Sequence, residues 1–564
     1  MAKRANARSK PEKAAPPAPP PQPEIPPPRT RPWLLIGLSA ALIALFLIVY
    51  WLRLDRVVGL VVDDAWYTLL AKTLATGQGY TIVNSPTSGI LPLYPPGFPA
   101  LLSIFYRVYP TFPDNIWLLK SVSIAAMLGS GLVCFYYFSR RRAMPRYVAL
   151  GIAATTAFDP GLVFLATSTV MSDCVFTLWQ MLTLIAAEKC VQHKAARTVW
   201  RYALLCGVIA SVAFLTRPMA LGLLAGVGLY LLKERLFRAA IIYAATIALL
   251  AGPWMIYSRL HAPTSEQQAE QGGHIVYPYT TQFWQRQAGQ VSSGTISANE
   301  IPERVWQNFS EITKHDIGAV AFYSFYRGIE PRDLVRIGEG GRNISILLSL
   351  LLLLGFIATV RARTTAAELA VPLSLVVTLL WGWAQDRLIL PLVPFFVFYM
   401  LMGLRAIAQL YRKLYGEPKP QAGLGAMTVA VWLIVVSSLY ANLQFIQRKY
   451  DPTPEYRLRW IMACDESETL MKYIGENVPK DAIIAAQNPA LVHLYTGHKT
   501  ISSDDPAGSW ETWNKLGVRY LTLTGLPSSP NNESKYRTVH RVNGMYHLRL
   551  LDLGEPSSRP AWGK

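Results

Sequence analysis

The chain alternates long apolar runs with short polar connections over most of its length. Runs of about 17 to 25 apolar residues are needed to cross the hydrocarbon layer of a membrane. Eleven such runs lie near 33–51, 115–138, 147–166, 172–189, 201–216, 218–232, 239–257, 343–360, 368–384, 388–408 and 424–443. This pattern predicts an α-helical polytopic membrane protein.

Charged residues mark two of the breaks between runs. The apolar stretch 369–404 would be about 54 Å long as one helix, against a hydrocarbon thickness of about 30 Å. Asp386 and Arg387 interrupt it, because each charge at the centre of a bilayer costs roughly 2.5 to 3.5 kcal/mol on insertion scales. Arg217, followed by Pro218, separates two other runs for the same reason.

The distribution of positive charge predicts the orientation. The chain carries 54 Lys and Arg against 35 Asp and Glu, a formal net charge of +19. Most of this excess lies in short loops between apolar runs, which favours the cytoplasmic side of a membrane protein over a nucleic-acid-binding surface. With eleven crossings, the N-terminus is cytoplasmic, and the segments 52–114, 258–342 and 446–564 lie outside.

The two ends of the chain differ in composition from the middle. Residues 1–32 are rich in proline and predict a disordered cytoplasmic tail. Residues 33–445 are the expected transmembrane domain. Residues 446–564 have polar turns, alternating apolar segments and one helical pattern, which predict a soluble α/β domain outside the membrane.

Six charged residues in or beside the spans fall on the same predicted outer face. Acidic pairs at a membrane surface are typical of catalytic sites, but Asp63, Asp64 and Asp173 also stand where a helix begins, so helix capping is an alternative. The six residues are Asp63, Asp64, Asp173, Arg217, Asp386 and Arg387.

Several motifs in this set resemble a known family. The runs 63–67 (Asp-Asp-Ala-Trp-Tyr) and 94–99 (Tyr-Pro-Pro-Gly-Phe-Pro) look like the first outer loop of bacterial C-type glycosyltransferases. This family includes the protein O-mannosyltransferases and the aminoarabinose transferases of lipid A. Further matches are 170–173, 215–218 and 386–394, and the resemblance covers roughly residues 33 to 550.

The resemblance implies a fold and an activity. The fold is that of C-type glycosyltransferases, with about 11 to 13 transmembrane helices and a C-terminal soluble α/β domain. The activity is transfer of a sugar, a hexose or a pentose, from a polyprenyl-phosphate donor to a lipid, protein or glycan acceptor. The reaction takes place at the outer face of a bacterial inner membrane or plasma membrane and inverts the anomeric carbon.

The resemblance also implies roles for individual residues. Asp63 is the expected general base, and Asp64 is expected to orient it or to bind a cation. Arg217 and Arg387 are expected to bind the donor phosphate, because a guanidinium binds phosphate through paired hydrogen bonds and stays charged. The alternatives for the arginines are contact with lipid headgroups or an ion pair with Asp386.

The metal requirement is undetermined at the sequence level. Aminoarabinose transferases have an acidic residue before the first-loop proline that binds zinc together with a loop histidine, and this chain has Tyr94 there. His274 remains, but one histidine is not a zinc site. Tyr94, Asp173, Asp386 and His274 are therefore candidate contacts for substrate or cation. A divalent cation on Asp63, Asp64 or Asp173 stays open, because carboxylates suit such ions.

Two other classes of protein fit part of the pattern. A transporter or flippase of lipid-linked saccharides also needs many spans, but such proteins commonly contain structural repeats, and the sequence gives no sign of one. A scaffold without catalysis predicts that the charged residues lie far apart in space. An outer cluster that contains Asp63, Asp173, Arg217 and Arg387 would argue against the scaffold.

Overall fold

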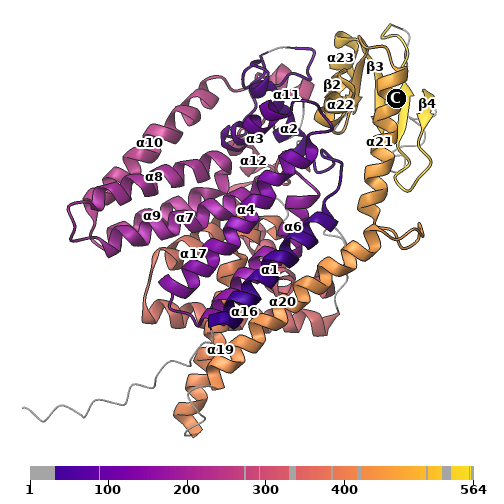
Figure 1. Cartoon of the computed structure of the whole chain (residues 1–564). Helices are drawn as coiled ribbons and strands as arrows, with labels where there is room; N and C mark the ends of the chain where they lie inside the picture. The colour runs from indigo at the N-terminus through magenta and orange to yellow at the C-terminus, as the bar shows by residue number, and fades with distance from the viewer. Residues whose placement is uncertain are drawn as a thin grey trace, which may run out of the picture.

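The computed structural model is a large helical body with a small sheet domain at one end (Figure 1). It describes residues 32–87, 89–271, 275–290, 293–328, 338–382, 385–415, 422–503, 506–523, 535–557 and 559. Among these residues, eight helices are long and apolar enough to cross a membrane. They are α1 (Pro32–Arg53), α4 (Ile116–Tyr136) with its π-helical extension η1 (Tyr137–Arg141), α7 (Asp173–Gln192), α8 (Val199–Thr216), α10 (Phe237–Leu260), α16 (Glu339–Ala362), α19 (Val393–Tyr415) together with the residues from Asp386 that precede it, and α20 (Ala422–Lys449).

The three remaining apolar runs are helical as well, but bent or shorter. The run 147–166 forms α5 (Arg146–Phe158) and α6 (Pro160–Thr167), which meet at an angle of 46°. Asp159 begins α6 by accepting a 3.0 Å hydrogen bond from the backbone N–H of Leu162. The other two runs are α9 (Leu221–Lys233), behind the 3₁₀ turn η2 (Pro218–Ala220), and α17 (Ala366–Leu380). The helical membrane architecture is therefore confirmed, and eleven crossings stay a prediction.

Shorter helices occupy the predicted outer segments. The first segment contains α2 (Asp63–Ala75) and α3 (Gly97–Val108). The second contains α11 (Ser265–Gln271), α12 (Tyr279–Trp284), η4 (Ala298–Glu300), α13 (Ile301–Glu311), the π-helix η5 (Ile312–Asp316), α14 (Ile317–Ala321) and α15 (Tyr323–Arg327). The charged break before α19 forms the short helix α18 (Gln385–Ile389) and the turn η6 (Leu390–Leu392).

The C-terminal domain is a five-stranded sheet with three helices, and it lies beside α2 and α11 (Figure 1). Its elements are α21 (Arg459–Asn477), β1 (Ile483–Ala486), α22 (Pro489–Thr496), β2 (Lys499–Ser502), α23 (Pro506–Leu516), β3 (Val518–Leu523), β4 (Arg537–Arg541) and β5 (Arg549–Asp552). The strand order is β2-β1-β3-β5-β4, with β2, β1 and β3 parallel and β5 antiparallel to both β3 and β4. The expected α/β domain is therefore confirmed.

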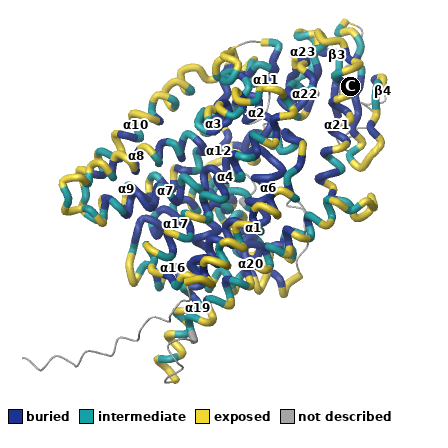
Figure 2. The backbone as a smooth tube through the Cα atoms, viewed as in Figure 1, coloured by how far each residue is buried: buried dark blue, intermediate teal, exposed yellow. Residues whose placement is uncertain are grey.

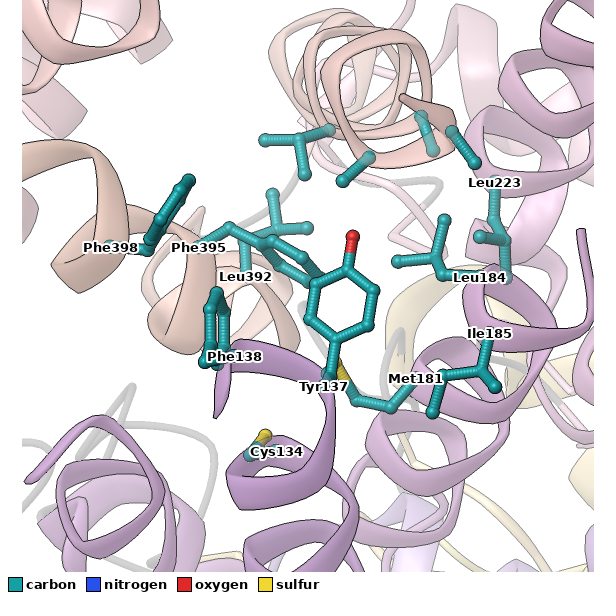
Figure 3. Close-up of a cluster of buried hydrophobic side chains, with 14 of the residues drawn as sticks. Cys134, Tyr137, Phe138, Met181, Leu184, Ile185, Leu223, Leu392, Phe395 and Phe398 are labelled. Atoms are coloured by element: carbon teal, nitrogen blue, oxygen red, sulfur yellow. The ribbon is translucent and has the colours of Figure 1, made fainter. Parts of the chain in front are cut away.

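The burial pattern fits a helical bundle in lipid. Exposed positions follow the outer sides of the long helices (Figure 2), and many of them are large apolar residues such as Leu249 on α10, Leu347 on α16 and Leu433 on α20. Water would penalise such a surface, whereas the hydrocarbon layer accepts it. The inner sides meet in an apolar cluster that includes Tyr137, Phe138, Met181, Leu184 and Phe395 (Figure 3).

Small residues let α9 and α17 approach closely. A Cβ atom added to Gly222 would lie 2.4 Å from the Cα of Ser374, and one added to Gly226 would lie 2.3 Å from the Cα of Ala370. Glycines four residues apart lie on one helix face and permit this contact in membrane helices. The contact fixes α9, which follows directly after Arg217.

A larger residue at Gly226 should separate α9 from α17. We expect Gly226→Val to lower the free energy of unfolding by at least about 1 to 3 kcal/mol through overpacking, measured as a lower apparent Tm of the purified protein in detergent. Gly228→Val is the matched control, since a Cβ at Gly228 would meet only the Tyr243 ring, at 3.9 Å. Equal Tm values for the two variants would contradict the close contact.

Candidate active site

Four elements bring four of the six predicted charged residues together. Asp63 is the first residue of α2, and Asp173 is the first residue of α7. Arg217 ends α8 in an extended conformation, and Arg387 lies on α18. Positions at the first turn of a helix favour a carboxylate because the backbone N–H groups there are partly positive.

Arg387 bridges the two carboxylates. Its Nη1 lies 2.7 Å from Oδ2 of Asp63, and its Nη2 and Nε lie 3.1 and 3.2 Å from Oδ2 of Asp173. Arg217 Nη1 lies 2.7 Å from the same Asp173 oxygen. The group thus contains two negative and two positive charges, which compensate one another away from bulk water.

Exposure differs along this group. The side chain of Asp173 is 0% exposed and that of Arg217 is 8% exposed, whereas those of Asp63 and Arg387 are 17% and 22% exposed. Oδ1 of Asp173 is buried and has no hydrogen-bond partner among the described residues. A buried carboxylate oxygen without a donor is costly, and the two arginines on Oδ2 offset part of that cost.

Tyr94 is the fifth member of the group. Its hydroxyl donates a 2.7 Å hydrogen bond to Oδ1 of Asp63. Burial and the negative charge of Asp63 raise the pKa of Tyr94 well above its ordinary value, so the phenol keeps its proton. Tyr94 is thus a neutral donor that faces the predicted base.

Asp64 faces away from this group. Its Oδ2 accepts the backbone N–H of Gly59 at 2.7 Å, and its Oδ1 accepts those of Val61 and Ala65, each at 3.1 Å. The residue is 0% exposed, and burial raises its pKa to about 6 in spite of these hydrogen bonds. Asp64 therefore holds the loop before α2, while Asp63 meets the arginine.

The backbone at Val62, directly before Asp63, has an unusual conformation. Val62 has φ 67° and ψ −64°, and the N–H of Asp63 donates a 2.8 Å hydrogen bond to the carbonyl of Val61. This is the γ-turn form that is rare and strained, above all for a β-branched residue. Such strain persists only where the surroundings hold the chain in place. Here the turn precedes Asp63, whose side chain contacts Arg387.

The C-terminal domain holds the other side of the same loop. Asn488 Nδ2 donates to the carbonyl of Gly59, and the hydroxyl of Tyr495 lies 3.2 Å from the backbone N and O of Val58. Further back, Asp55 accepts hydrogen bonds from Lys120 Nζ at 2.5 Å and from Trp460 Nε1 at 2.8 Å. The loop 54–62 is thus fixed from α4, α21 and α22.

Asp386 belongs to a second charged group. Its Oδ2 lies 3.5 Å from Nη1 of Arg327, and Nη2 of the same guanidinium binds Asp316. Within the described part of the chain, Glu311, His315 and Asp316 are the residues whose ligand atoms lie close enough together to hold a metal ion. The predicted contact His274 lies outside the described residues.

Three residues near the site had no predicted role. Ser172 Oγ lies 3.3 Å from the hydroxyl of Tyr67 and 3.4 Å from Arg217 Nη1. A Cβ added to Gly97 would lie 2.7 Å from the carbonyl of Leu215, so this glycine lets α3 pack against the chain just before Arg217. All three lie inside the motifs that carry the family resemblance. Membership in these motifs was the sequence signal that could have identified them as site residues.

Comparison with solved structures gives the class of fold. No protein-family model matches the chain, and no curated protein matches its sequence. The structure of ArnT from Cupriavidus metallidurans bound to undecaprenyl phosphate is similar, with a TM-score of 0.54 and 12% identity, over 91% of this chain and 98% of that one. The apo state of the same ArnT matches with a TM-score of 0.52 and 12% identity, over 92% and 98%.

A weaker similarity is to the Archaeoglobus fulgidus oligosaccharyltransferase in complex with zinc and sulfate, with a TM-score of 0.48 and 12% identity, over 82% of this chain and 63% of that one. The chain has the membrane fold of C-type glycosyltransferases. More particularly, it has the fold of ArnT over almost its whole length, which confirms the fold expected from the sequence motifs.

The burial of Asp64 should make stability depend on pH. Because burial raises its folded pKa from an ordinary value of 3.8 to about 6, Asp64 stabilises the fold below about pH 4, and this contribution is lost as the pH rises through 6. The shift corresponds to about 3 kcal/mol. We expect the apparent Tm of the wild type to fall relative to that of Asp64→Asn between about pH 4 and 7. A Tm difference that does not change with pH would contradict this account.

Proposed function

We propose that the chain is a glycosyltransferase that transfers a sugar from a polyprenyl-phosphate donor to an acceptor at the outer face of the membrane. One observation carries the proposal. Asp63, Asp173, Arg217 and Arg387 form one partly exposed group in a chain with the fold of ArnT. The ArnT structure with undecaprenyl phosphate supports the choice of donor.

The reaction needs a base and positive charge. The acceptor oxygen attacks C1 of the sugar, and the bond between C1 and the phosphate oxygen breaks. Polyprenyl phosphate leaves with the bonding electrons, and the acceptor proton passes to a carboxylate. Attack from the face opposite the phosphate inverts C1, and a phosphate leaving group needs no proton near neutral pH.

Asp63 is the proposed base. Its side chain is 17% exposed, whereas Asp173 is closed to solvent and Asp64 binds backbone N–H groups. Hydrogen bonds from Tyr94 and Arg387 hold its carboxylate in one orientation.

Arg387 and Arg217 are the proposed phosphate contacts. The phosphate gains one negative charge when the bond to the sugar breaks, so guanidinium groups stabilise the transition state more than the bound donor. In the structure both arginines bind Asp173. Donor binding would therefore redirect some of their N–H groups from Asp173 to phosphate oxygens, while Asp173 keeps the arginines in place.

The site does not fit a divalent cation in this arrangement. Arg387 fills the space between Asp63 and Asp173, and Asp64 faces the loop backbone. In the second charged group, Arg327 already binds Oδ1 of Asp316.

Removal of the base should abolish transfer. We expect Asp63→Asn to lower the turnover of radiolabelled sugar from a polyprenyl-phosphate donor panel by at least about 100-fold, because the amide cannot take the proton. The purified variant should keep the elution profile of the wild type. Asp114→Asn, an exposed position in the same outer segment, is the matched control and should transfer normally.

Two results would contradict the proposal. Full turnover by Asp63→Asn would remove Asp63 as the base. If no donor in the panel gave transfer with the wild type, and carrier-linked sugar moved between the membrane leaflets instead, the protein would be a flippase.

A further inference from the structure

Helix α13 in the second predicted outer segment has three chemically different sides. One side faces the protein and carries the buried Arg304 and the half-buried Asn308. A second side exposes two aromatic rings, since Trp306 is 64% and Phe309 43% exposed, and the ring centroids lie 5.9 Å apart. The third side exposes the polar residues Glu303, Gln307 and Glu311. A helix whose exposed surface divides into an apolar and a polar strip is typical of the boundary between lipid and water.

Hydrogen bonds to a long membrane helix set the level of α13. The helix continues into η5, where the carbonyl of Thr313 accepts hydrogen bonds from Ser345 Oγ at 2.8 Å and Ser349 Oγ at 3.1 Å. Both serines lie on α16, in the same turns that expose Ile344 and Leu347. Large apolar side chains that face outward on a membrane helix contact lipid. The end of α13 therefore lies beside a lipid-facing part of α16.

The inner side of α13 holds the end of α17. Asn308 Nδ2 donates to the carbonyl oxygens of Leu379 at 2.8 Å and Trp381 at 3.0 Å. Arg304 Nη1 donates to the carbonyl of Leu380 at 3.4 Å. Helix α17 ends at this point, and α18, which carries the arginine between the two carboxylates, follows within a few residues. The two side chains of α13 thus fix the chain shortly before the candidate active site.

Arg304 joins the same segment to α12. Its Nη1 also donates to the carbonyl of Phe283 at 2.7 Å, and its Nη2 donates to that of Gln285. A Cβ added to Gly382 would lie 3.2 Å from the Arg304 guanidinium, and the carbonyl of Gly382 accepts the N–H of Ala288 at 2.9 Å. Hydrogen bonds from a charged donor are stronger than those between neutral groups. A displacement of α13 would therefore be passed to the end of α17.

We propose that Trp306 and Phe309 insert into the interface of the lipid bilayer, and that this contact with lipid holds α13 against the end of α17. Tryptophan is enriched at the boundary between headgroups and acyl chains. Lipid is a better occupant of the aromatic strip than a protein partner, because the strip leads to the lipid-facing turns of α16. The polar strip then faces water. This proposal does not depend on the reaction that the protein catalyses.

Quenching by brominated lipid tests the contact. The purified full chain is placed in nanodiscs of phosphatidylcholine that is brominated near the glycerol end of its acyl chains. The fluorescence of Trp306 is measured as the difference between the wild type and Trp306→Phe. We expect the brominated lipid to lower this difference by at least about twofold, because an interfacial helix is buried only about 5 to 10 Å deep. The matched control is Trp510→Phe on α23 of the sheet domain, whose difference should not change.

Two results would overturn the contact with lipid. If aqueous iodide quenched Trp306 and the brominated lipid did not, the aromatic strip would face water. If neither agent quenched it, a second copy of the chain or another protein would cover the strip.

Hydrogen–deuterium exchange tests whether the lipid contact holds α17. Trp306→Glu places a charge on the lipid side of α13, and Gln307→Glu places the same charge on the polar strip. We expect Trp306→Glu in nanodiscs to raise the exchange rate of the amides in residues 378–382 by at least about tenfold, since a charge is unfavourable in lipid and local opening speeds exchange. Gln307→Glu should exchange as the wild type. Trp306→Gln, which adds no charge, should give a smaller change in the same direction.

The exchange experiment can also contradict the second half of the proposal. If Trp306→Glu and Trp306→Gln raised exchange in α13 alone, the hydrogen bonds of Arg304 and Asn308 would not pass the lipid contact to α17. Equal exchange in Trp306→Glu and Gln307→Glu would have the same meaning. The quenching experiment would then still decide whether the aromatic strip contacts lipid.

Discussion

The guanidinium of Arg387 between the carboxylates of Asp63 and Asp173 is the contact on which the candidate active site depends. The two acidic residues lie 324 and 214 positions away from it in the chain. Two carboxylates this close would repel each other without a cation. The arginine therefore allows the first residues of α2 and α7 to lie close together. Arg217 adds a second positive charge beside the buried Asp173.

Polar side chains from three parts of the chain bind the short loop before α2. Asp64 binds this loop from within, Lys120 binds it from the membrane helices, and Asn488 binds it from the C-terminal domain. These contacts hold the strained turn at Val62 that directs Asp63. The C-terminal domain thus has a physical connection to the site.

The sequence predicts the parts of this arrangement that depend on local pattern. Apolar runs of membrane length give the helices, and charges that avoid hydrocarbon place Arg217 and Arg387 at helix ends. The partners of each side chain depend on tertiary contacts, and the pattern does not contain them. Neighbouring residues in a helix point about 100° apart, so Asp64 faces a loop while Asp63 faces Arg387, and Asp386 turns to Arg327. The hydrogen bond from Tyr94 to Asp63 likewise cannot be predicted from the local pattern.

Arg217 and Arg387 are the proposed contacts of the donor phosphate beside Asp63. The most direct measurement is an electron cryomicroscopy structure of the full chain with a polyprenyl phosphate. We expect phosphate oxygens within hydrogen-bond distance of Arg217 and Arg387, with at least one arginine contact to Asp173 replaced. Density for the phosphate elsewhere, with the bridge from Asp63 through Arg387 to Asp173 intact, would contradict it.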